Sequence, residues 1–364
     1  MDGKKIPKYL QLKHELLSWL QTGKLQPGQQ FPSENEIAEQ FGLSRQTVRQ
    51  TFGELEKDGW LERIQGKGTF ARNPVRRDGE AVKTIGIMTT YISDYIFPHI
   101  VRGAEAELRS HGYRLLLSST DNTKEKEMDS LQLMTGQPLS GLIIEPTKSA
   151  EGNPNLGYFL ELQEKGIPYL MINEKYRELE CPCLKVDDEA GGHKAARHLL
   201  ENGHRSIAGF FKRDDLQGVN RLKGFLSAHR EQGITVSPQH VVTYTTEQKG
   251  DYAYQKAIEL LQGTPEQRPT ALVCYNDELA VMLMDAAAAC GLRIPEDLSV
   301  IGFDDSSLAA ASGTKLTTLT HPKTAMGELA ARQLVGMIER GESPGDTVFE
   351  PELVERDSVH RITL

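Results

Sequence analysis

Side chains that can read DNA bases gather in one short stretch of the sequence, at Arg45, Gln46 and Arg49. Arginine can make two hydrogen bonds to the edge of guanine, and glutamine can do the same with adenine. Apolar residues recur between them at helical spacing, which predicts a helix that begins after Ser44 as its N-cap. The polar side chains then lie mostly on the opposite face. We therefore expect an exposed first turn that could contact bases in the major groove.

The neighbouring elements are of the kind that would position such a helix. Residues 33–36, Ser-Glu-Asn-Glu, form a capping box and start a preceding helix, which ends at Gly42. Two strand-like runs, 60–65 and 69–71, flank Gly-Lys-Gly and predict a hairpin with Lys67 at its tip. Each feature alone fits an ordinary helical domain with a charged surface. Their order favours a helix-turn-helix followed by a wing.

The run PSENEIAEQFGLSRQTVRQTFGELEKDGWLERIQGKGTF resembles, nearly position by position, the winged helix-turn-helix of the GntR family of bacterial transcription regulators. The resemblance covers roughly residues 6–72 and implies binding to double-stranded operator DNA. It implies that Glu34 contacts a base or orients an arginine. The other implied DNA contacts are base contacts by Arg45, Gln46 and Arg49, phosphate contacts by Lys8 and Thr47, and minor-groove approach by Gln65 and Lys67.

The charge distribution agrees with a DNA-binding head. Residues 1–77 hold 13 basic and 9 acidic residues, a net charge of +4, whereas the whole chain of 364 residues has −9. A basic head on an acidic body suggests contact with a polyanion. No stretch approaches the roughly 18 uncharged apolar residues of a membrane span, and no signal peptide is visible. Four scattered cysteines indicate reduced thiols without a metal site, so we expect a cytoplasmic protein.

From about residue 84 the pattern changes to short apolar runs that alternate with helical runs. Strands are expected at 85–88, 115–118, 142–144, 169–172, 207–211, 271–274 and 300–303. Such alternation predicts an α/β fold with doubly wound parallel sheets, and the length suffices for two lobes. We expect a DNA-binding domain at 1–72, a linker at 73–83, and an effector-binding and dimerisation domain at 84–364.

Polar side chains follow several of these expected strands. Glu145, Asn276 and Asp304 each come just after a strand, and Arg221 begins a helix. Ligands of open α/β sheets bind beyond the carboxyl ends of the strands, so these groups could bind the hydroxyls of a small sugar. Asp277 and Asp305 also follow strands, and for these two we expect helix capping instead.

Segments such as VDDEAGGHKAARHLLENGHRSIAGF, CYNDELA and IPEDLSVIGFDD resemble the effector-binding body of the LacI/GalR regulators, which has the two-lobed fold of periplasmic sugar-binding proteins. That resemblance implies three chain crossings between the lobes. Its implied effector contacts are Asp94, Phe97, Glu145, Arg221, Asn276 and Asp304.

The pairing of this head with this body, and the segments TTYISDYIFP, IIEPTKSA and YNDE, resemble bacterial arabinose-responsive regulators. That resemblance implies L-arabinose as the effector. It adds Tyr91, Lys148 and Asn173 to the expected contacts. Composition and spacing alone indicate only a small, neutral, hydroxyl-rich ligand.

These features predict a homodimeric, sugar-responsive repressor that binds palindromic operator DNA, with no catalytic residues, cofactor or membrane contact. A first alternative is an enzyme with a GntR-type head and a pyridoxal-phosphate-dependent body. A second is a transport-type sugar-binding protein. A third is the same regulator with another sugar or small metabolite as its effector.

Overall fold

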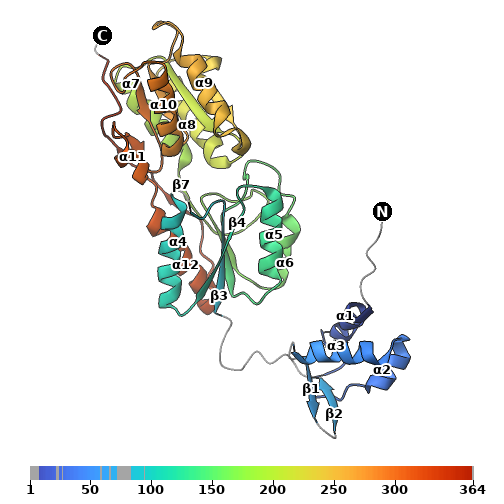
Figure 1. Cartoon of the computed structure of the whole chain (residues 1–364). Coiled ribbons are helices and arrows are strands. Elements are labelled where there is room, and N and C mark those ends of the chain that lie inside the picture. The colour runs from blue at the N-terminus through green and yellow to red at the C-terminus, as the bar shows by residue number, and fades with distance from the viewer. Residues whose placement is uncertain are drawn as a thin grey trace. The chain divides into compact units, whose positions relative to one another are not determined.

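The computed structural model describes residues 8–21, 24–26, 28–57, 60–64, 67–71, 83–93 and 95–362. Backbone contacts divide the chain into two compact units, residues 1–81 and 82–364, each of which is described by itself (Figure 1). The predicted linker at 73–83 lies almost wholly outside the described residues. In the part of the chain that the structure describes, no helix is both long and apolar enough to cross a membrane.

The first unit is a winged helix-turn-helix, as predicted (Figure 1). Ser33 and Glu36 form the predicted capping box, in which the Ser33 amide donates to Glu36 Oε2 at 2.7 Å. Gly42 ends that helix in the left-handed conformation, with φ of 61°. Val48, Phe52 and Leu55 are fully buried and hold the third helix in the core. The elements are α1 (Lys8–Gln21), α2 (Glu34–Phe41), α3 (Arg45–Lys57) and the antiparallel strands β1 (Leu61–Ile64) and β2 (Gly68–Ala71).

The second unit contains two lobes, each built on a parallel sheet, which confirms the predicted fold class. The N-terminal lobe has the strand order β13-β7-β6-β5-β3-β4. Helices α4 and α12 pack together on one face of this sheet, and α5 and α6 cover the other (Figure 1). Its elements are β3 (Thr84–Thr89), α4 (Phe97–Ser110), β4 (Arg114–Ser119), α5 (Lys124–Thr135), β5 (Gly141–Ile144), α6 (Leu156–Glu164), β6 (Tyr169–Ile172), β7 (Cys183–Val186), α12 (Lys323–Arg340) and β13 (Thr347–Phe349).

The C-terminal lobe has the strand order β11-β10-β8-β9, with the helix pairs α7–α8 and α9–α10 in contact. The chain passes between the lobes after β7, before α12 and after β13, where β12 and β14 pair antiparallel. The elements of this part are α7 (Asp188–Glu201), β8 (Ile207–Lys212), α8 (Leu216–Glu231), β9 (Val241–Tyr244), α9 (Asp251–Leu261), β10 (Ala271–Cys274), α10 (Asp277–Ala289), β11 (Ser299–Ile301), α11 (Ser307–Ala311), β12 (Thr318–Leu319) and β14 (Leu353–Val354), with short 3₁₀ turns at Pro238–His240 and Thr246–Gln248.

Two glycines let α7 and α8 approach each other backbone to backbone. A Cβ atom on Gly192 would lie 2.0 Å from the carbonyl oxygen of Arg221, and one on Gly224 would lie 2.0 Å from that of Glu189. No side chain fits in that space. The contact therefore fixes the position of α8, the helix that carries Arg221.

Candidate nucleic-acid interface and ligand pocket

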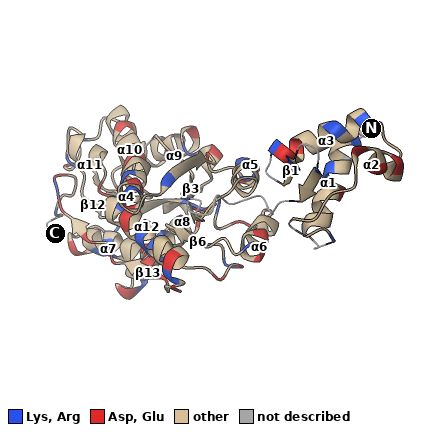
Figure 2. Cartoon of the chain, turned by 90° about the horizontal axis from the view of Figure 1, so that it is seen from below, with Lys and Arg blue, Asp and Glu red and all other residues tan. Residues whose placement is uncertain are grey.

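The first turn of α3 presents the predicted base-reading side chains to solvent. Arg45 and Arg49 have side chains that are 62% and 63% exposed, and Gln46 is exposed between them. Ser44 caps the helix, because its hydroxyl oxygen accepts from the Thr47 amide at 3.2 Å. Figure 2 shows basic residues along α3 and acidic residues on α2. The exposed end of α3 can therefore present guanidinium and amide groups to base edges.

Glu34 lies beside three arginines. Its carboxylate is 3.4 Å from Arg45 Nε, 3.3 Å from Arg49 Nε and 3.5 Å from Arg63 Nη2, and its side chain is only 17% exposed. Arg63, on the wing strand β1, did not emerge from the sequence pattern. One carboxylate facing three guanidinium groups makes a cluster with a net positive charge. The carboxylate fixes the positions of the three guanidinium groups. Of the two roles expected for Glu34, this arrangement fits the orienting of arginines.

The remaining predicted DNA contacts are spread over the unit. Lys8 is exposed at the start of α1, and Lys67 is exposed at the turn between the wing strands. The Lys67 carbonyl accepts from Gln30 Nε2 at 3.0 Å, which ties the turn to the segment before α2. Thr47 is partly exposed beside Ser44. Gln65 lies outside the described residues.

A pocket of about 110 Å³ lies between the two lobes, at the ends of the strands where sheet-bound ligands are expected. Most of the predicted effector contacts line it, whereas Lys148 and Asn173 do not, and Asp94 lies outside the described residues. The predicted residues that line the pocket are Tyr91, Phe97, Glu145, Arg221, Asn276 and Asp304, and other lining residues include Thr90, Tyr95, Asn122, Lys212, Asp215, Lys249, Tyr275 and Glu278.

Glu145 is held in one orientation by three hydrogen bonds. Its Oε2 accepts from the amide and the hydroxyl of Thr90, both at 2.7 Å, and its Oε1 accepts from Asn173 Nδ2 at 2.7 Å. Burial raises the pKa of Glu145, and the bonds from Thr90 and Asn173 oppose that rise. Asn173 in turn accepts from His321 Nε2 at 3.0 Å. Asn173 therefore positions a pocket carboxylate and does not line the pocket itself.

Arg221 is buried and is held by its neighbours from several sides. Its Nε donates to Asp188 Oδ1 at 2.7 Å and its Nη1 to the Tyr275 carbonyl at 2.6 Å. The guanidinium lies 3.6 Å from the centre of the Phe303 ring. Burial disfavours its charge, but Asp188 and Asp304 hold the pKa of Arg221 above its ordinary value. Its Nη2 is 3.7 Å from Asp304 Oδ1, a buried oxygen that has no hydrogen-bond partner among the described residues.

Two further cations line the pocket, and the sequence pattern did not reveal either of them. Lys212 ends the buried strand β8, and its Nζ lies 3.0 Å from Asp215 Oδ2. Burial lowers its affinity for a proton, but Asp215 and Asp214 outweigh this effect and raise the pKa of Lys212. Lys249 pairs with Glu278 at 2.6 Å. Each cation described in the pocket thus already has a carboxylate partner, which favours a neutral ligand over a phosphorylated one.

The capping role expected for Asp277 and Asp305 is wrong. Asn276 is the N-cap of α10, since its Oδ1 accepts from the Leu279 amide at 2.9 Å, and its amide nitrogen remains as a donor at the pocket. Asp277 is fully buried and accepts from the Ser306 amide at 2.7 Å. Asp305 pairs with Arg356 at 2.6 Å. A polar residue after a strand can thus bind the next loop as readily as the next helix.

Tyr95 is another pocket residue that the sequence pattern does not reveal. Its φ is +64°, and its hydroxyl donates to the Phe303 carbonyl at 2.9 Å and accepts from the Asp277 amide at 3.1 Å. The side chain therefore reaches from the N-terminal lobe to the backbone of the C-terminal lobe. Tyr91 and Phe97 pack against each other with ring centres 5.7 Å apart. Aromatic rings, amide donors and carboxylates that neighbouring residues hold in place together suit a small molecule with several hydroxyl groups.

Comparison with known proteins agrees with this two-part construction. Residues 8–71 match the model described as bacterial regulatory proteins, gntR family, and residues 196–359 match the periplasmic binding protein-like domain. An arabinose metabolism transcriptional repressor of Geobacillus stearothermophilus is 55% identical over 364 residues, all of both chains. The chain belongs to the family of arabinose metabolism transcriptional repressors. A second such repressor, from Halalkalibacterium halodurans, is 45% identical over 363 residues, 96% of each chain.

The body of this repressor has the fold of solved LacI family regulators. A LacI family transcriptional regulator from Enterococcus faecium with bound ribose superposes with a TM-score of 0.64 at 25% identity, covering 77% of this chain and 100% of that chain. The repressor is thus a DNA-binding, sugar-responsive regulator with a GntR-type head and a LacI-type body. The resemblances stated from the sequence are confirmed. The alternative of a pyridoxal-phosphate-dependent enzyme is excluded, because the relatives are transcriptional repressors.

Proposed function

We propose that this repressor binds near-palindromic operator DNA as a homodimer and that L-arabinose releases it from that operator. The names of the two relatives that match nearly the whole chain support the sugar. Two heads related by a two-fold axis suit two half-sites of a palindrome. It follows from this proposal that the protein acts in the cytoplasm, where its target genes are.

In this proposal residues 1–72 form the DNA-binding domain, 73–83 the linker, and 84–364 the domain for effector binding and dimerisation. Arg45, Gln46 and Arg49 read bases in the major groove, and Glu34 orients the arginines. Lys8 and Thr47 contact phosphates, and Gln65 and Lys67 approach the minor groove. The exposure of the first turn of α3 and the three arginines around Glu34 support these roles.

The polar groups in the pocket are the main support for a neutral monosaccharide as the effector. Asp304 Oδ1 is a buried acceptor without a hydrogen-bond partner among the described residues, and Arg221, Asn276 and Lys212 supply donors in the same pocket. A hydroxyl group is both donor and acceptor, so a sugar can satisfy both kinds of group at once. The volume of about 110 Å³ is well below the roughly 300–1,000 Å³ of pockets for drug-sized ligands. It favours one sugar ring over a disaccharide.

The proposed control works through the two lobes. Sugar bound between them favours their closed arrangement, and this shifts the relative placement of the two heads of the dimer. Sugar and operator then oppose each other through one coupling free energy, typically about 1–3 kcal/mol.

A second candidate is the same regulator with another pentose as its effector. The structurally similar regulator from Enterococcus faecium with bound ribose favours D-ribose as the first sugar to compare. Ribose and arabinose differ only in the arrangement of their hydroxyl groups. The pocket must therefore discriminate by hydrogen-bond geometry.

Calorimetric titration of the full-length repressor with L-arabinose, D-ribose, D-xylose and D-galactose tests this proposal. We expect saturable binding of L-arabinose and much weaker heats from the other sugars. A titration of operator-bound protein, followed by fluorescence anisotropy of labelled operator DNA, then tests release. Binding of another sugar in place of L-arabinose would retain the regulator and reject this effector.

A further inference from the structure

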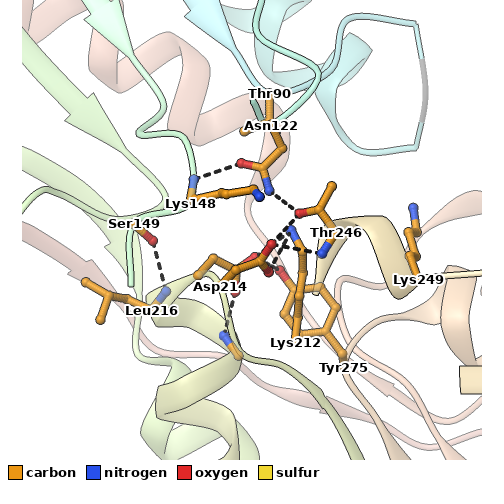
Figure 3. Close-up of polar contacts among 12 residues, drawn as sticks. Thr90, Asn122, Lys148, Ser149, Lys212, Asp214, Leu216, Thr246, Lys249 and Tyr275 are labelled. Atoms are coloured by element: carbon orange, nitrogen blue, oxygen red, sulfur yellow. Dashed lines mark hydrogen bonds and ion pairs between the residues drawn. The ribbon is translucent and has the colours of Figure 1, made fainter. Parts of the chain in front are cut away.

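Beside the effector pocket, loops of the two lobes are joined by a cluster of hydrogen bonds (Figure 3). The N-terminal lobe contributes Asn122, from the loop after β4, and residues 147–150, from the loop after β5. The C-terminal lobe contributes Asp214, after β8, and Thr246, after β9. We call these contacts the latch. Asn122 lines the effector pocket, whereas Thr246 and Asp214 do not.

The hydroxyl group of Thr246 is the centre of the latch. It donates to Asp214 Oδ2 at 2.6 Å and accepts from Asn122 Nδ2, in the other lobe, at 2.7 Å. The Thr246 amide also donates to Asp214 Oδ2, at 2.8 Å. Asn122 Oδ1 accepts from the Lys148 amide at 2.9 Å, so Asn122 is fixed within its own lobe. Figure 3 shows this chain of contacts running from Lys148 through Asn122 and Thr246 to Asp214. One hydroxyl group thus uses both its donor and an acceptor site to connect the lobes.

Three further contacts cross between the same loops. The Leu216 amide donates to Ser149 Oγ at 2.9 Å, and the Ala150 amide donates to the Asp214 carbonyl at 3.3 Å. Lys148 Nζ pairs with Glu247 at 2.5 Å. If the lobes separate at this side of the pocket, all of these contacts break together. The Leu216 and Ala150 amides are therefore direct reporters of closure.

The N-terminal half of the latch is anchored to its own lobe. The Thr147 carbonyl accepts from Lys124 Nζ at 2.6 Å and from the Tyr176 hydroxyl at 2.8 Å. The Thr147 amide donates to the buried Glu127 at 3.2 Å. These bonds hold the loop after β5, which also carries Glu145. Opening is therefore expected to break the latch contacts and leave the loop in place.

The closed arrangement also carries a cost at Asp214. This residue is 1% exposed, and its Oδ1 has no hydrogen-bond partner among the described residues. The nearest cation, Lys212 Nζ, is 3.8 Å away. A buried, incompletely bonded carboxylate opposes closure, whereas the Thr246 bridge favours it. The Thr246 bridge and the incompletely bonded carboxylate of Asp214 thus act on closure in opposite directions.

We propose that Thr246 is a positioning residue of the effector response. Its hydroxyl group joins the lobes and stabilises their closed arrangement, and it raises sugar affinity without touching the sugar. This inference rests on the effector control proposed above. Tyr95 makes a separate contact between the lobes, so loss of the Thr246 bridge weakens closure without abolishing it.

The first test needs no sugar. Hydrogen–deuterium exchange of the full-length protein is measured for the peptides that carry Ala150 and Leu216. Thr246→Val keeps the shape of the side chain and removes the hydroxyl, so we expect at least threefold faster exchange in both peptides. Thr246→Ser keeps the hydroxyl and should restore the wild-type rate. Thr264→Val, an exposed threonine of the same lobe, is the control. Equal exchange in wild type and Thr246→Val would overturn the proposal.

The second test measures sugar affinity by calorimetry with L-arabinose. Loss of one neutral bridging group is expected to weaken binding about 3- to 10-fold in Thr246→Val. Thr246→Ser should stay within about twofold of wild type. If the serine variant binds as weakly as the valine variant, the hydroxyl is not responsible and the inference fails.

A milder variant covers the case in which Thr246→Val does not fold. Glu247 is 59% exposed and its pair with Lys148 joins the lobes, whereas the exposed pair of Lys256 and Glu259 lies within α9. Glu247→Gln is expected to speed exchange at Leu216 more than Glu259→Gln does. Equal rates in these two variants would contradict the latch. Wild-type protein that binds no L-arabinose, together with faster exchange in Thr246→Val, would reject the proposed effector and retain the latch.

Discussion

At the scale of single residues, Asp304 offers the sharpest test of the effector pocket. Its Oδ1 is buried without a hydrogen-bond partner among the described residues, at 3.7 Å from Arg221 Nη2. Asp304→Asn replaces a charged acceptor, so we expect L-arabinose affinity to fall at least tenfold by calorimetry. Operator affinity in the absence of sugar should stay within about twofold of wild type. Asp129→Asn, an exposed carboxylate on α5, is the control, and equal losses in both variants would contradict a specific role for Asp304.

The residues of this pocket show what the sequence pattern can and cannot reveal. Glu145, Asn276 and Asp304 could be predicted because each is a polar residue just after an apolar strand. Asn173 occupies an equivalent position directly after β6, and Lys148 lies farther along the loop after β5, but Lys148 pairs with Glu247 and Asn173 binds Glu145. The direction of a loop side chain depends on contacts with residues far away in the sequence. The position alone cannot supply it.

Lys212 shows the opposite case. It ends a strand whose other residues are apolar and is followed by Arg-Asp-Asp. The lysine that closes an otherwise buried strand was a usable signal of a buried cation at a strand end. The strand expected at 207–211 makes Lys212 the first residue after an apolar run, the same position that marks Glu145.

In the DNA-binding unit, Glu34→Gln tests whether one carboxylate orders the arginine cluster. The variant keeps a hydrogen-bonding side chain but removes the charge that faces Arg45, Arg49 and Arg63. Added positive charge should strengthen non-specific binding, while looser arginines weaken base contacts. We expect the ratio of operator affinity to random-DNA affinity to fall about tenfold in fluorescence anisotropy titrations. Glu39→Gln, exposed on the same helix, should leave the ratio unchanged, and an unchanged ratio in Glu34→Gln would show that the arginines need no such partner.

His321 links the pocket to a segment between the lobes and should make stability depend on pH. Burial lowers its pKa to about 4, the charges of Lys323 and Arg221 add to this shift, and the charge of Asp304 opposes it. The ordinary value is about 6.5, so the unfolded chain binds the proton first as pH falls. Stability from the neutral imidazole is therefore complete above about pH 6.5 and is lost as pH falls toward 4.

That loss can be assigned to His321 by comparing variants. Integration over the two pKa values gives a loss of about 2 kcal/mol between pH 8 and pH 5. Urea unfolding measures the free energy of unfolding at pH 8 and at pH 5. Between these pH values, this free energy should fall by about 2 kcal/mol less in His321→Gln than in wild type. Other buried histidines contribute equally to both proteins, so an identical decrease in both would contradict the shift.

At the scale of elements, the close contact of α7 and α8 should be intolerant of any side chain. A Cβ atom at Gly224 would lie 2.0 Å from the Glu189 carbonyl and 2.6 Å from the His193 amide nitrogen. Gly224→Ala must push the helices apart, at a cost of typically about 1–3 kcal/mol. Since α8 carries Arg221, sugar affinity should fall as well. Gly157→Ala, at an exposed position on α6 with nothing within 4 Å, should not lower the free energy of unfolding in urea, and equal stability of the two variants would contradict the steric role of the contact.

Elements differed in how well their sequences predicted them. The capping box at Ser33 and the long apolar strand β8 carry strong local signals and lie where expected. Strands β7 and β9 were not predicted. A polar residue, Lys185 or Thr243, interrupts the apolar run of each strand, so local pattern does not separate it from a loop. Pairing with β6 and β8 completes them, and such pairing is a property of the assembled sheet.

At the scale of the whole molecule, the proposed control makes a prediction that does not depend on how the two units are placed. If L-arabinose and operator oppose each other through one coupling free energy, each must weaken the binding of the other by the same factor. For about 1–3 kcal/mol, that factor is roughly 5 to 150.

Operator affinity measured by anisotropy at saturating L-arabinose gives one factor. Calorimetry of L-arabinose binding to operator-saturated protein gives the other. Unequal factors would mean that a further equilibrium, such as dissociation of the dimer, responds to the sugar. A factor of one in both experiments would reject L-arabinose as the effector that controls DNA binding.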